Sequence, residues 1–442
     1  MSSSSDLGDV QDLVCIGFGP ASLAIAIALQ ESKFQTKPKV TFLERQPQFA
    51  WHAGMQLPGA KMQISFLKDL ATPRNPQSKF TFLSYLYDQN RLNTFINLGT
   101  FLPSRKEYED YLRWIAGHFE QQGLVSYGQD VLEVTPIVTS PSGKATHFRV
   151  TARDLATSKI TTRISRHVVI AVGGKPMLPT EFPQQHPAVV HSSTYSTQVH
   201  SALKNPLQEY NIAVIGSGQS AAEIFNDLPS RYPNAKVTMI IKNSALRPSD
   251  DSPFVNEIFD PDRVDALYQQ PEEIRTRAIA SDRATNYSVV RLNLIEHLYE
   301  RMYAQRLDNP DPASFKVKIL NNRRVVKTQT KAGLGDQILL QIQKVVKESD
   351  KQVENEELVV DAVFVATGYV RNAHEDILAK SRGLLRPGES KFPVRRDYKV
   401  DFDESKVAET AGIWLQGCNE RTHGVRLLSH LVFIVLLTTY FS

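Results

Sequence analysis

Two stretches of this chain share the same order of apolar strand, glycine turn and small-residue helix. The first is DLVCIGFGPASLAIAIAL at residues 12–29, and the second is NIAVIGSGQSAAEIF at residues 211–225. A strand that enters a helix through closely spaced glycines is typical of the first unit of a dinucleotide-binding βαβ fold. The sequence therefore predicts an α/β protein with two Rossmann-like, dinucleotide-binding domains.

Size, charge and cysteine content exclude several other classes of protein. The 442 residues suffice for two or three domains, and the net charge of +4 is spread along the chain without a basic stripe. We therefore expect no nucleic-acid partner. The two cysteines, Cys15 and Cys418, form no CxxC motif, so neither a disulfide framework nor a redox dithiol is expected.

The two ends of the chain carry no expected membrane segment. Residues 1–9 lack the apolar region of a signal peptide, and the apolar stretch at 431–442 is too short to span a bilayer. We expect a cytoplasmic protein that makes no membrane contact and buries its last residues in a helix or strand.

The first turn has the residues of an adenine dinucleotide site. It contains Gly17 and Gly19, with Ser22 at the third small position, and these allow a phosphate to approach the N-terminus of the following helix. The next strand, KVTFLER at 39–45, brings in Glu44, whose carboxylate can accept hydrogen bonds from ribose hydroxyls. The alternative is an ordinary strand, turn and helix without a ligand.

The second turn differs from the first at the end of its second strand. Its residues are Gly216, Gly218, Gln219, Ser220 and either Ala222 or, by strict spacing, Ala221. The strand KVTMIIK at 236–242 ends in Lys242, where an acid would repel a 2′-phosphate and a cation attracts it. The second turn therefore predicts NADPH binding, with a solvated surface lysine as the alternative for Lys242.

Two nucleotide sites in one chain indicate a flavoprotein that takes hydride from NADPH. The strand DAVFVATGY at 361–369 ends in Thr367 and Gly368, and we expect it to close the flavin domain next to the cofactor. Without a redox pair of cysteines, the electrons must pass to oxygen or to another acceptor.

Several longer segments resemble the microbial N-hydroxylating monooxygenases, which act on L-ornithine or L-lysine in siderophore biosynthesis. They are MQISFLKDLATPRNP at 62–76, LRPSDDSPFVNEIFDP at 246–261, GSGQSAAEIF at 216–225, TNYSVV at 285–290 and NERTHG at 419–424. The resemblance runs from about residue 10 to about residue 430 and is nearer to the ornithine branch. HSSTY at 191–195 is similar to part of the class B flavin monooxygenase fingerprint, with a structural linker histidine as the alternative.

The resemblance implies roles for individual residues. Met62 and Gln63 would lie against the flavin, Lys68 would pair with the substrate carboxylate, and Asn256 and Asn286 would hold the α-amino and carboxylate ends. Further contacts are implied from Tyr287 and Ser220 to NADPH and from Ser429 to the substrate. Independently of the resemblance, Trp51 and His52 lie in the loop after Glu44, where we expect them to form a wall of the flavin site. Gln63, Lys68 and Asn286 are the residues expected to take part in catalysis.

Three of these assignments have simpler alternatives. Lys68 can be a surface lysine paired with its neighbour Asp69, Asn256 can be a helix N-cap, and Met62 can fill a gap in the core.

The implied reaction is hydroxylation of the side-chain amine of L-ornithine. It would use FAD, NADPH and O2 through a flavin C4a-hydroperoxide, as the first step of hydroxamate siderophore synthesis. The alternatives are an L-lysine N-monooxygenase, an S- or Baeyer–Villiger oxygenase of the same plan, or a flavoprotein remnant without turnover. The resemblance also implies a homo-oligomer, a tetramer. The sequence departs from the family's pattern after THG, where the segment is shorter than is usual in relatives.

The expected domain order follows from the positions of the motifs. Residues 10–205 form the first part of the FAD domain, and 206–265 form the NADPH domain. Residues 266–335 form a helical substrate-binding region that returns to the NADPH domain, and 336–442 complete the FAD domain.

Overall fold

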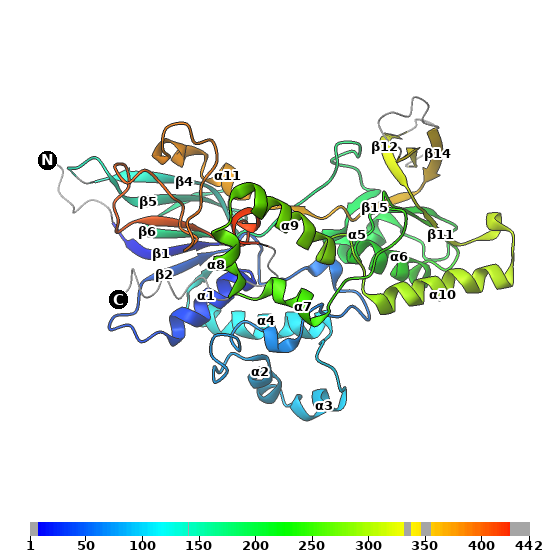
Figure 1. The fold of residues 1–442 in the computed structure, drawn as a ribbon, viewed down its shortest axis with the longest axis horizontal. Helices are drawn as coiled ribbons and strands as arrows, with labels where there is room; N and C mark the ends of the chain where they lie inside the picture. Colours follow the sequence, from blue (N-terminus) through cyan, green and yellow to red (C-terminus); the bar gives the residue numbers. More distant parts are fainter. Residues whose placement is uncertain (1–7, 140, 331–336, 346–354, 425–442) are drawn as a thin grey trace.

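The structure is a computed structural model that describes residues 8–139, 141–330, 337–345 and 355–424. It has two lobes, each built on a sheet with helices against it, and helices α7, α8 and α9 lie between the lobes (Figure 1). The prediction of two Rossmann-like domains is confirmed.

The first lobe is built on a seven-stranded sheet in the order β3-β2-β1-β6-β5-β4, with β17 also paired to β6. Its strands are β1 (Val10–Ile16), β2 (Val40–Leu43), β3 (Val125–Ser126), β4 (Gln129–Val138), β5 (Ala145–Asp154), β6 (Ile160–Ile170) and β17 (Gly412–Leu415). β6 pairs antiparallel with β5 at its beginning and parallel with β1 and β17 at its end. One strand thus joins an antiparallel meander to the nucleotide-binding half of the sheet.

The second lobe has a five-stranded sheet, in which every neighbouring pair is parallel, in the order β11-β10-β9-β15-β8. Its strands are β8 (Val189–His191), β9 (Asn211–Ile215), β10 (Lys236–Ile240), β11 (Val317–Leu320) and β15 (Ala362–Val365). A small antiparallel sheet of β12 (Arg323–Thr330), β13 (Ile338–Lys344) and β14 (Asn355–Val360) comes before β15 in the chain.

The chain crosses between the lobes at two places that differ from the expected boundaries. It leaves the first sheet after β6 and returns after β15, and the crossings pair with one another as β7 (Lys175–Pro176) and β16 (Tyr369–Val370). The boundaries expected at residues 205 and 336 are therefore wrong, since β8 and β12–β15 belong to the second lobe. The strand at 361–369 does not close the flavin domain either, because an apolar run predicts a strand but not the sheet that it joins.

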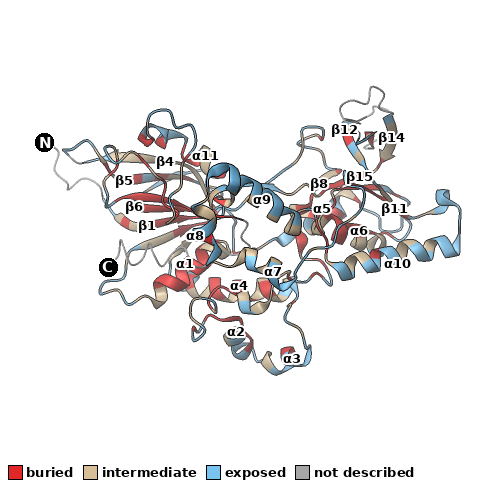
Figure 2. Ribbon diagram, viewed as in Figure 1, coloured by how far each residue is buried: buried red, intermediate tan, exposed pale blue. Residues whose placement is uncertain are grey.

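Helices cover the sheets where the sequence has an apolar stripe. In α4 (Arg105–Glu120), Ser104 caps the first turn, and the buried residues, which recur at helical spacing, include Tyr108, Tyr111 and Ile115. Three other long helices are buried to different extents, from one without any exposed residue at 20–31 to one with a single buried residue at 292–308 (Figure 2). These are α1 (Pro20–Glu31), α6 (Gln219–Arg231) and α10 (Leu292–Asp308), and the shorter ones include α2 (Phe82–Asp88), α3 (Leu92–Asn97), α5 (Tyr195–Ala202) and α11 (Ala373–Ile377).

A helical segment of the second lobe reaches back onto the first. It consists of α7 (Pro253–Asn256), α8 (Arg263–Tyr268) and α9 (Glu272–Asn286), and it meets α12 (Glu420–His423). The Tyr268 hydroxyl donates to the Val394 carbonyl at 3.1 Å, and Arg396 forms an ion pair with Asp265. The helical region therefore begins near residue 253, earlier than the expected residue 266. Among the described residues, no helix is long and apolar enough to cross a membrane.

Candidate active site

The first glycine turn leaves no room for a side chain at Gly17. Its φ is +94°, and a Cβ there would lie 2.5 Å from the carbonyl oxygen of Ala171, at the end of β6. The buried hydroxyl of Ser22 donates to the Gly17 carbonyl at 2.6 Å, so Ser22 holds the turn from inside. A Cβ at Gly19 would meet no atom within 4 Å. The turn is closed towards the sheet and open on the side where a phosphate would approach α1.

Glu44 lies at this turn, as the sequence predicts. Its carboxylate is buried and accepts the N–H of Phe18 at 2.7 Å and that of Gln46 at 2.8 Å. Each oxygen of a carboxylate has two acceptor positions, so capacity remains for hydroxyl donors of a nucleotide.

The second turn repeats this geometry in the second lobe. Gly216 has φ +130°, and a Cβ there would lie 2.5 Å from the carbonyl oxygen of Ala366. Gly218 is the N-cap of α6, and Ser220 lies half-buried in the first turn of that helix. The Gln219 side chain is engaged inside the protein, because it donates to Glu223 and accepts from the N–H of Arg291, both at 2.9 Å.

Lys242 lies two residues after the end of β10 and is exposed. No described residue forms an ion pair with it, so its charge is available to an anion at the edge of the second sheet. Next to it, the Asn243 side chain accepts a hydrogen bond from Ser217 of the turn at 3.3 Å.

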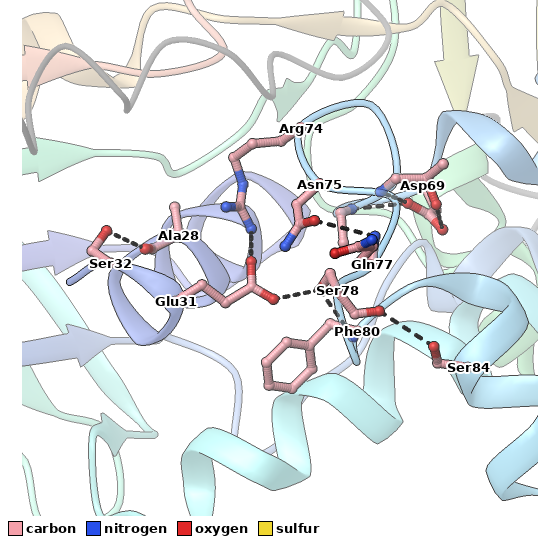
Figure 3. Close-up of polar contacts among 12 residues, drawn as sticks. Ala28, Glu31, Ser32, Asp69, Arg74, Asn75, Gln77, Ser78, Phe80 and Ser84 are labelled. Atoms are coloured by element: carbon pink, nitrogen blue, oxygen red, sulfur yellow. Dashed lines mark hydrogen bonds and ion pairs between the residues drawn. The ribbon is translucent and has the colours of Figure 1, made fainter.

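The long loop at 47–80 contains only two short 3-10 turns, η1 (Ala53–Met55) and η2 (Phe66–Lys68). It is held by Asp69, which is 1 % exposed and accepts four hydrogen bonds, from the N–H groups of Ala71, Thr72 and Phe82 and the Thr72 hydroxyl. Burial raises the pKa of Asp69, and these donors oppose that shift. In Figure 3 the following turn is tied to α1, where Glu31 pairs with Arg74 and accepts from Ser78.

We expect Asp69→Asn to lower the free energy of unfolding by about 2–3 kcal/mol, because the amide would place its own N–H groups against buried donors. Urea unfolding followed by circular dichroism measures this loss. The exposed Asp308→Asn on α10 is the matched control, with an expected change within about 0.5 kcal/mol. Equal values for the two variants would contradict the assigned role of Asp69.

Lys68 points to a partner other than its neighbour. Its ammonium lies 3.8 Å from a carboxylate oxygen of Asp260, and both side chains are partly exposed. Asp260 follows α7 and η4 (Glu257–Phe259), in the same segment as Asn256. The alternative of a Lys68–Asp69 pair is wrong, because the donors of the loop occupy both oxygens of Asp69.

Asn256 occupies the N-cap position of η4, but its side chain makes no capping hydrogen bond there. It is the last residue of α7, and its side-chain amide donates to the Asp251 carbonyl at 2.8 Å. Its side-chain oxygen is free of any described donor. Lys68 therefore contacts, through Asp260, the segment that also carries Asn256.

The end of α9 is held by α12. Asn286 is the last residue of α9, and the hydroxyl of Tyr287 donates to Glu420 at 3.0 Å. Arg283 lies over the Tyr287 ring at 4.3 Å and forms an ion pair with Glu420 at 3.2 Å. Burial and the nearby Glu420 carboxylate raise the pKa of Tyr287, so it remains a neutral hydrogen-bond donor at neutral pH.

The residues expected beside the flavin ring occupy the loop between η1 and η2 and the segment before η1. Met62 is buried in the core of the first lobe, and Gln63 beside it is half-buried. The ring of Trp51 packs against Tyr108 with 5.7 Å between centroids. His52 has φ +47°, and desolvation together with Arg105 and Arg371 lowers its pKa to about 4.

His191 links β8 to the crossing that follows β15. Its Nδ1 accepts the N–H of Ser193 at 3.1 Å, so Nε2 carries the proton and donates to the Gly368 carbonyl at 3.1 Å. Thr367 donates to the Met177 carbonyl on the other crossing. The structural role left open for His191 is the one that these contacts support.

The sequence does not predict every charged residue at the site, and one predicted residue is not among those that the structure describes. Ser429 lies outside the described residues. Arg105, Glu223, Asp260 and Glu420 received no role, although the last three lie within the quoted motifs. A charged side chain inside a motif was the available signal, but only the fold shows which partner it meets.

A family model described as L-lysine 6-monooxygenase/L-ornithine 5-monooxygenase matches residues 9–371. The chain belongs to this family. The match includes both glycine turns, the loop that carries Lys68, and the segment from α7 to the end of α9.

Individual relatives are similar in sequence and structure to nearly the whole chain. It is 51 % identical to an L-ornithine N(5)-monooxygenase of Aspergillus oryzae over 94 % of this chain and 85 % of the relative. The structure of an ornithine hydroxylase from Pseudomonas aeruginosa superposes with a TM-score of 0.84 at 35 % identity, covering 98 % of both chains. An ornithine N-hydroxylase of Kutzneria, solved with reduced FAD, NADP⁺ and L-ornithine, gives 0.83 at 33 % identity over 96 % of each chain.

Proposed function

We propose that this protein is an FAD- and NADPH-dependent monooxygenase that hydroxylates the side-chain amine of L-ornithine. The observation that carries the proposal is the meeting of Lys68 with the segment from Asn256 to Asp260, in a chain with two glycine turns. The 51 % identity with a fungal L-ornithine N(5)-monooxygenase favours ornithine. A lysine 6-monooxygenase of Pseudomonas syringae is only 26 % identical, which makes lysine the second candidate.

The first turn is proposed to hold FAD and the second NADPH. At the first, Gly17, Gly19 and Glu44 fit a pyrophosphate and a ribose, and at the second, Gly216, Gly218 and Lys242 fit a nucleotide with a 2′-phosphate. When bound there, FAD would supply oxygen activation, and NADPH would supply the reducing equivalents. The corresponding domains are residues 8–172 with 371–424 for FAD and 189–365 for NADPH.

The other residues are proposed to bind and orient the amino acid. Lys68 pairs with its carboxylate, and Asn256 and Asn286 hold its α-amino and carboxylate ends. Gln63, Met62, Trp51 and His52 lie on the flavin side, and Tyr287 and Ser220 on the NADPH side. The side-chain amine must be neutral to react, but its pKa in water is that of a lysine, about 10.4. The main tasks of the site are therefore to desolvate this amine and to orient it.

Turnover by the purified protein tests this function. We expect NADPH oxidation with added FAD to yield a hydroxylamine product from L-ornithine and far less from L-lysine. A pocket discriminates one methylene by about 1–3 kcal/mol, or roughly 10- to 200-fold. NADPH oxidation without hydroxylamine would overturn the proposed substrate, and no NADPH oxidation would favour a flavoprotein remnant.

Lys242 gives a second prediction about the reductant. We expect Lys242→Ala to raise KM for NADPH about tenfold and to leave KM for NADH within twofold, because only NADPH carries the 2′-phosphate. Lys242→Arg should keep or lower KM for NADPH, since its planar fork matches a phosphate. Steady-state kinetics with both coenzymes provides the measurement, and equal changes for both would contradict the assignment.

The cellular setting of the protein is also a proposal. Two free cysteines agree with a reducing compartment such as the cytoplasm. We propose a homo-oligomer, a tetramer, which light scattering of the purified protein tests.

A further inference from the structure

A buried ion pair connects the two lobes. Arg105 is the first residue of α4 in the first lobe. Its two terminal guanidinium nitrogens, Nη1 and Nη2, donate to the two carboxylate oxygens of Glu223 at 2.9 and 2.8 Å. Glu223 lies on α6, the helix that follows the second glycine turn. The two side chains are only 13 % and 7 % exposed. A fork-to-fork pair of this kind fixes direction as well as distance.

The pair belongs to a chain of hydrogen bonds that runs from η1 to the second glycine turn. Arg105 also donates to the Met55 carbonyl of η1, in the loop expected beside the flavin. On the other side, Glu223 accepts from Gln219, the residue directly after Gly218, and Gln219 accepts the N–H of Arg291. The loop of the first lobe and the N-terminus of α6 therefore share one buried polar network.

A second contact lies beside the ion pair. Ser196 of α5 donates to the Ala53 carbonyl at 2.7 Å. A Cβ at Gly54 would lie 2.0 Å from the carbonyl oxygen of Ser193, so the backbones of η1 and of the segment before α5 touch directly. The loop of the first lobe thus enters the second lobe at η1, where Met55 packs in the core of the second lobe, and Arg105 and Glu223 are the charged part of this joint.

We propose that Arg105 and Glu223 are positioning residues for hydride transfer, because they hold the second glycine turn in register with the flavin-side loop. This inference rests on the proposed function. Neither side chain needs to touch a reacting atom. Loss of the pair would leave both nucleotide sites formed within their own lobes but would loosen the distance between them, and a transfer step is sensitive to such a displacement.

Asp227 offers a matched control on the same helix. It lies one turn after Glu223, forms an ion pair with Arg231 and accepts from Tyr195 at 2.7 Å, and these contacts stay within the second lobe. Glu223→Gln thus breaks a charged contact between lobes, and Asp227→Asn breaks one inside a lobe.

The experiment compares these variants with the wild type by anaerobic stopped-flow reduction and by hydrogen exchange. For Glu223→Gln we expect at least a tenfold fall in the rate constant of flavin reduction at saturating NADPH, with the Kd for NADPH within threefold and bound FAD unchanged. Asp227→Asn should keep the reduction rate within twofold. Arg105→Lys, which keeps the charge and loses the fork, should give an intermediate rate.

Hydrogen exchange of the protein without NADPH gives a readout independent of turnover. We expect Glu223→Gln to speed exchange at residues 53–56 of η1 and at 219–225 of α6, and Asp227→Asn to leave exchange at 53–56 unchanged. If Glu223→Gln does not fold, Arg105→Met with Glu223→Met replaces the pair without an unpaired buried charge. A reduction rate within twofold of the wild type, or exchange that changes in α6 alone, would overturn the proposal. Absence of reduction in the wild type would instead refute the proposed function, and the exchange measurement would still test the joint.

Discussion

Gly17→Ala is expected to purify with almost no FAD. The new Cβ would lie 2.5 Å from the Ala171 carbonyl oxygen, and the residue would have to keep φ +94°, which L side chains rarely adopt. Both the clash and the strain act on the turn that would receive the pyrophosphate. We expect the Kd for FAD to rise at least 100-fold, or about 2.7 kcal/mol, as measured by fluorescence titration of the apoprotein.

Gly59→Ala is the control that introduces backbone strain without a steric clash. Gly59 also has a positive φ, +76°, but a Cβ there would meet no atom within 4 Å. A residue forced into this region costs roughly 1–2 kcal/mol, which should lower stability without changing FAD affinity. If Gly17→Ala bound FAD as tightly as Gly59→Ala, the first turn would not be the FAD site.

Lys68→Ala is expected to give the largest loss of substrate affinity. A hydrogen bond to a charged group contributes about 1.5–3 kcal/mol, so KM for L-ornithine should rise roughly 10- to 150-fold. The loss should be near the upper end, because the Asp260 carboxylate, 3.8 Å away, would then face the substrate carboxylate without a cation between them. Flavin reduction by NADPH without ornithine should stay within twofold of the wild type.

Lys61→Ala is the control for this prediction. Lys61 lies in the same loop, is exposed, and has the same charge. Its removal changes the net charge equally and should leave KM for L-ornithine within twofold. An equal rise of KM in both variants would show that Lys68 acts through general charge and not through contact with the substrate.

The two nucleotide-binding units and their order can be predicted from local sequence patterns. An apolar strand, closely spaced glycines and a small-residue helix are local features, and Gly17 and Gly216 take positive φ because the same backbone path repeats in both lobes. Glu44 and Lys242 were predicted at strand ends for the same reason, since the end of the second strand in a βαβ unit always lies beside the first turn. Helices with an apolar stripe, such as α4, can also be predicted from the spacing of their apolar residues.

The contacts between distant segments, in contrast, depend on how the whole chain folds. β15 joined the second sheet instead of the first, because its apolar residues suit either buried sheet and strand pairing is settled by the whole fold. Lys68 forms an ion pair with Asp260, 192 positions along the chain, and Arg105 forms one with Glu223. These partners meet because the fold places their segments side by side. Side-chain partners at such separations leave no period or spacing in the sequence, so the charged contacts of the site and the joint between the lobes came from the fold alone.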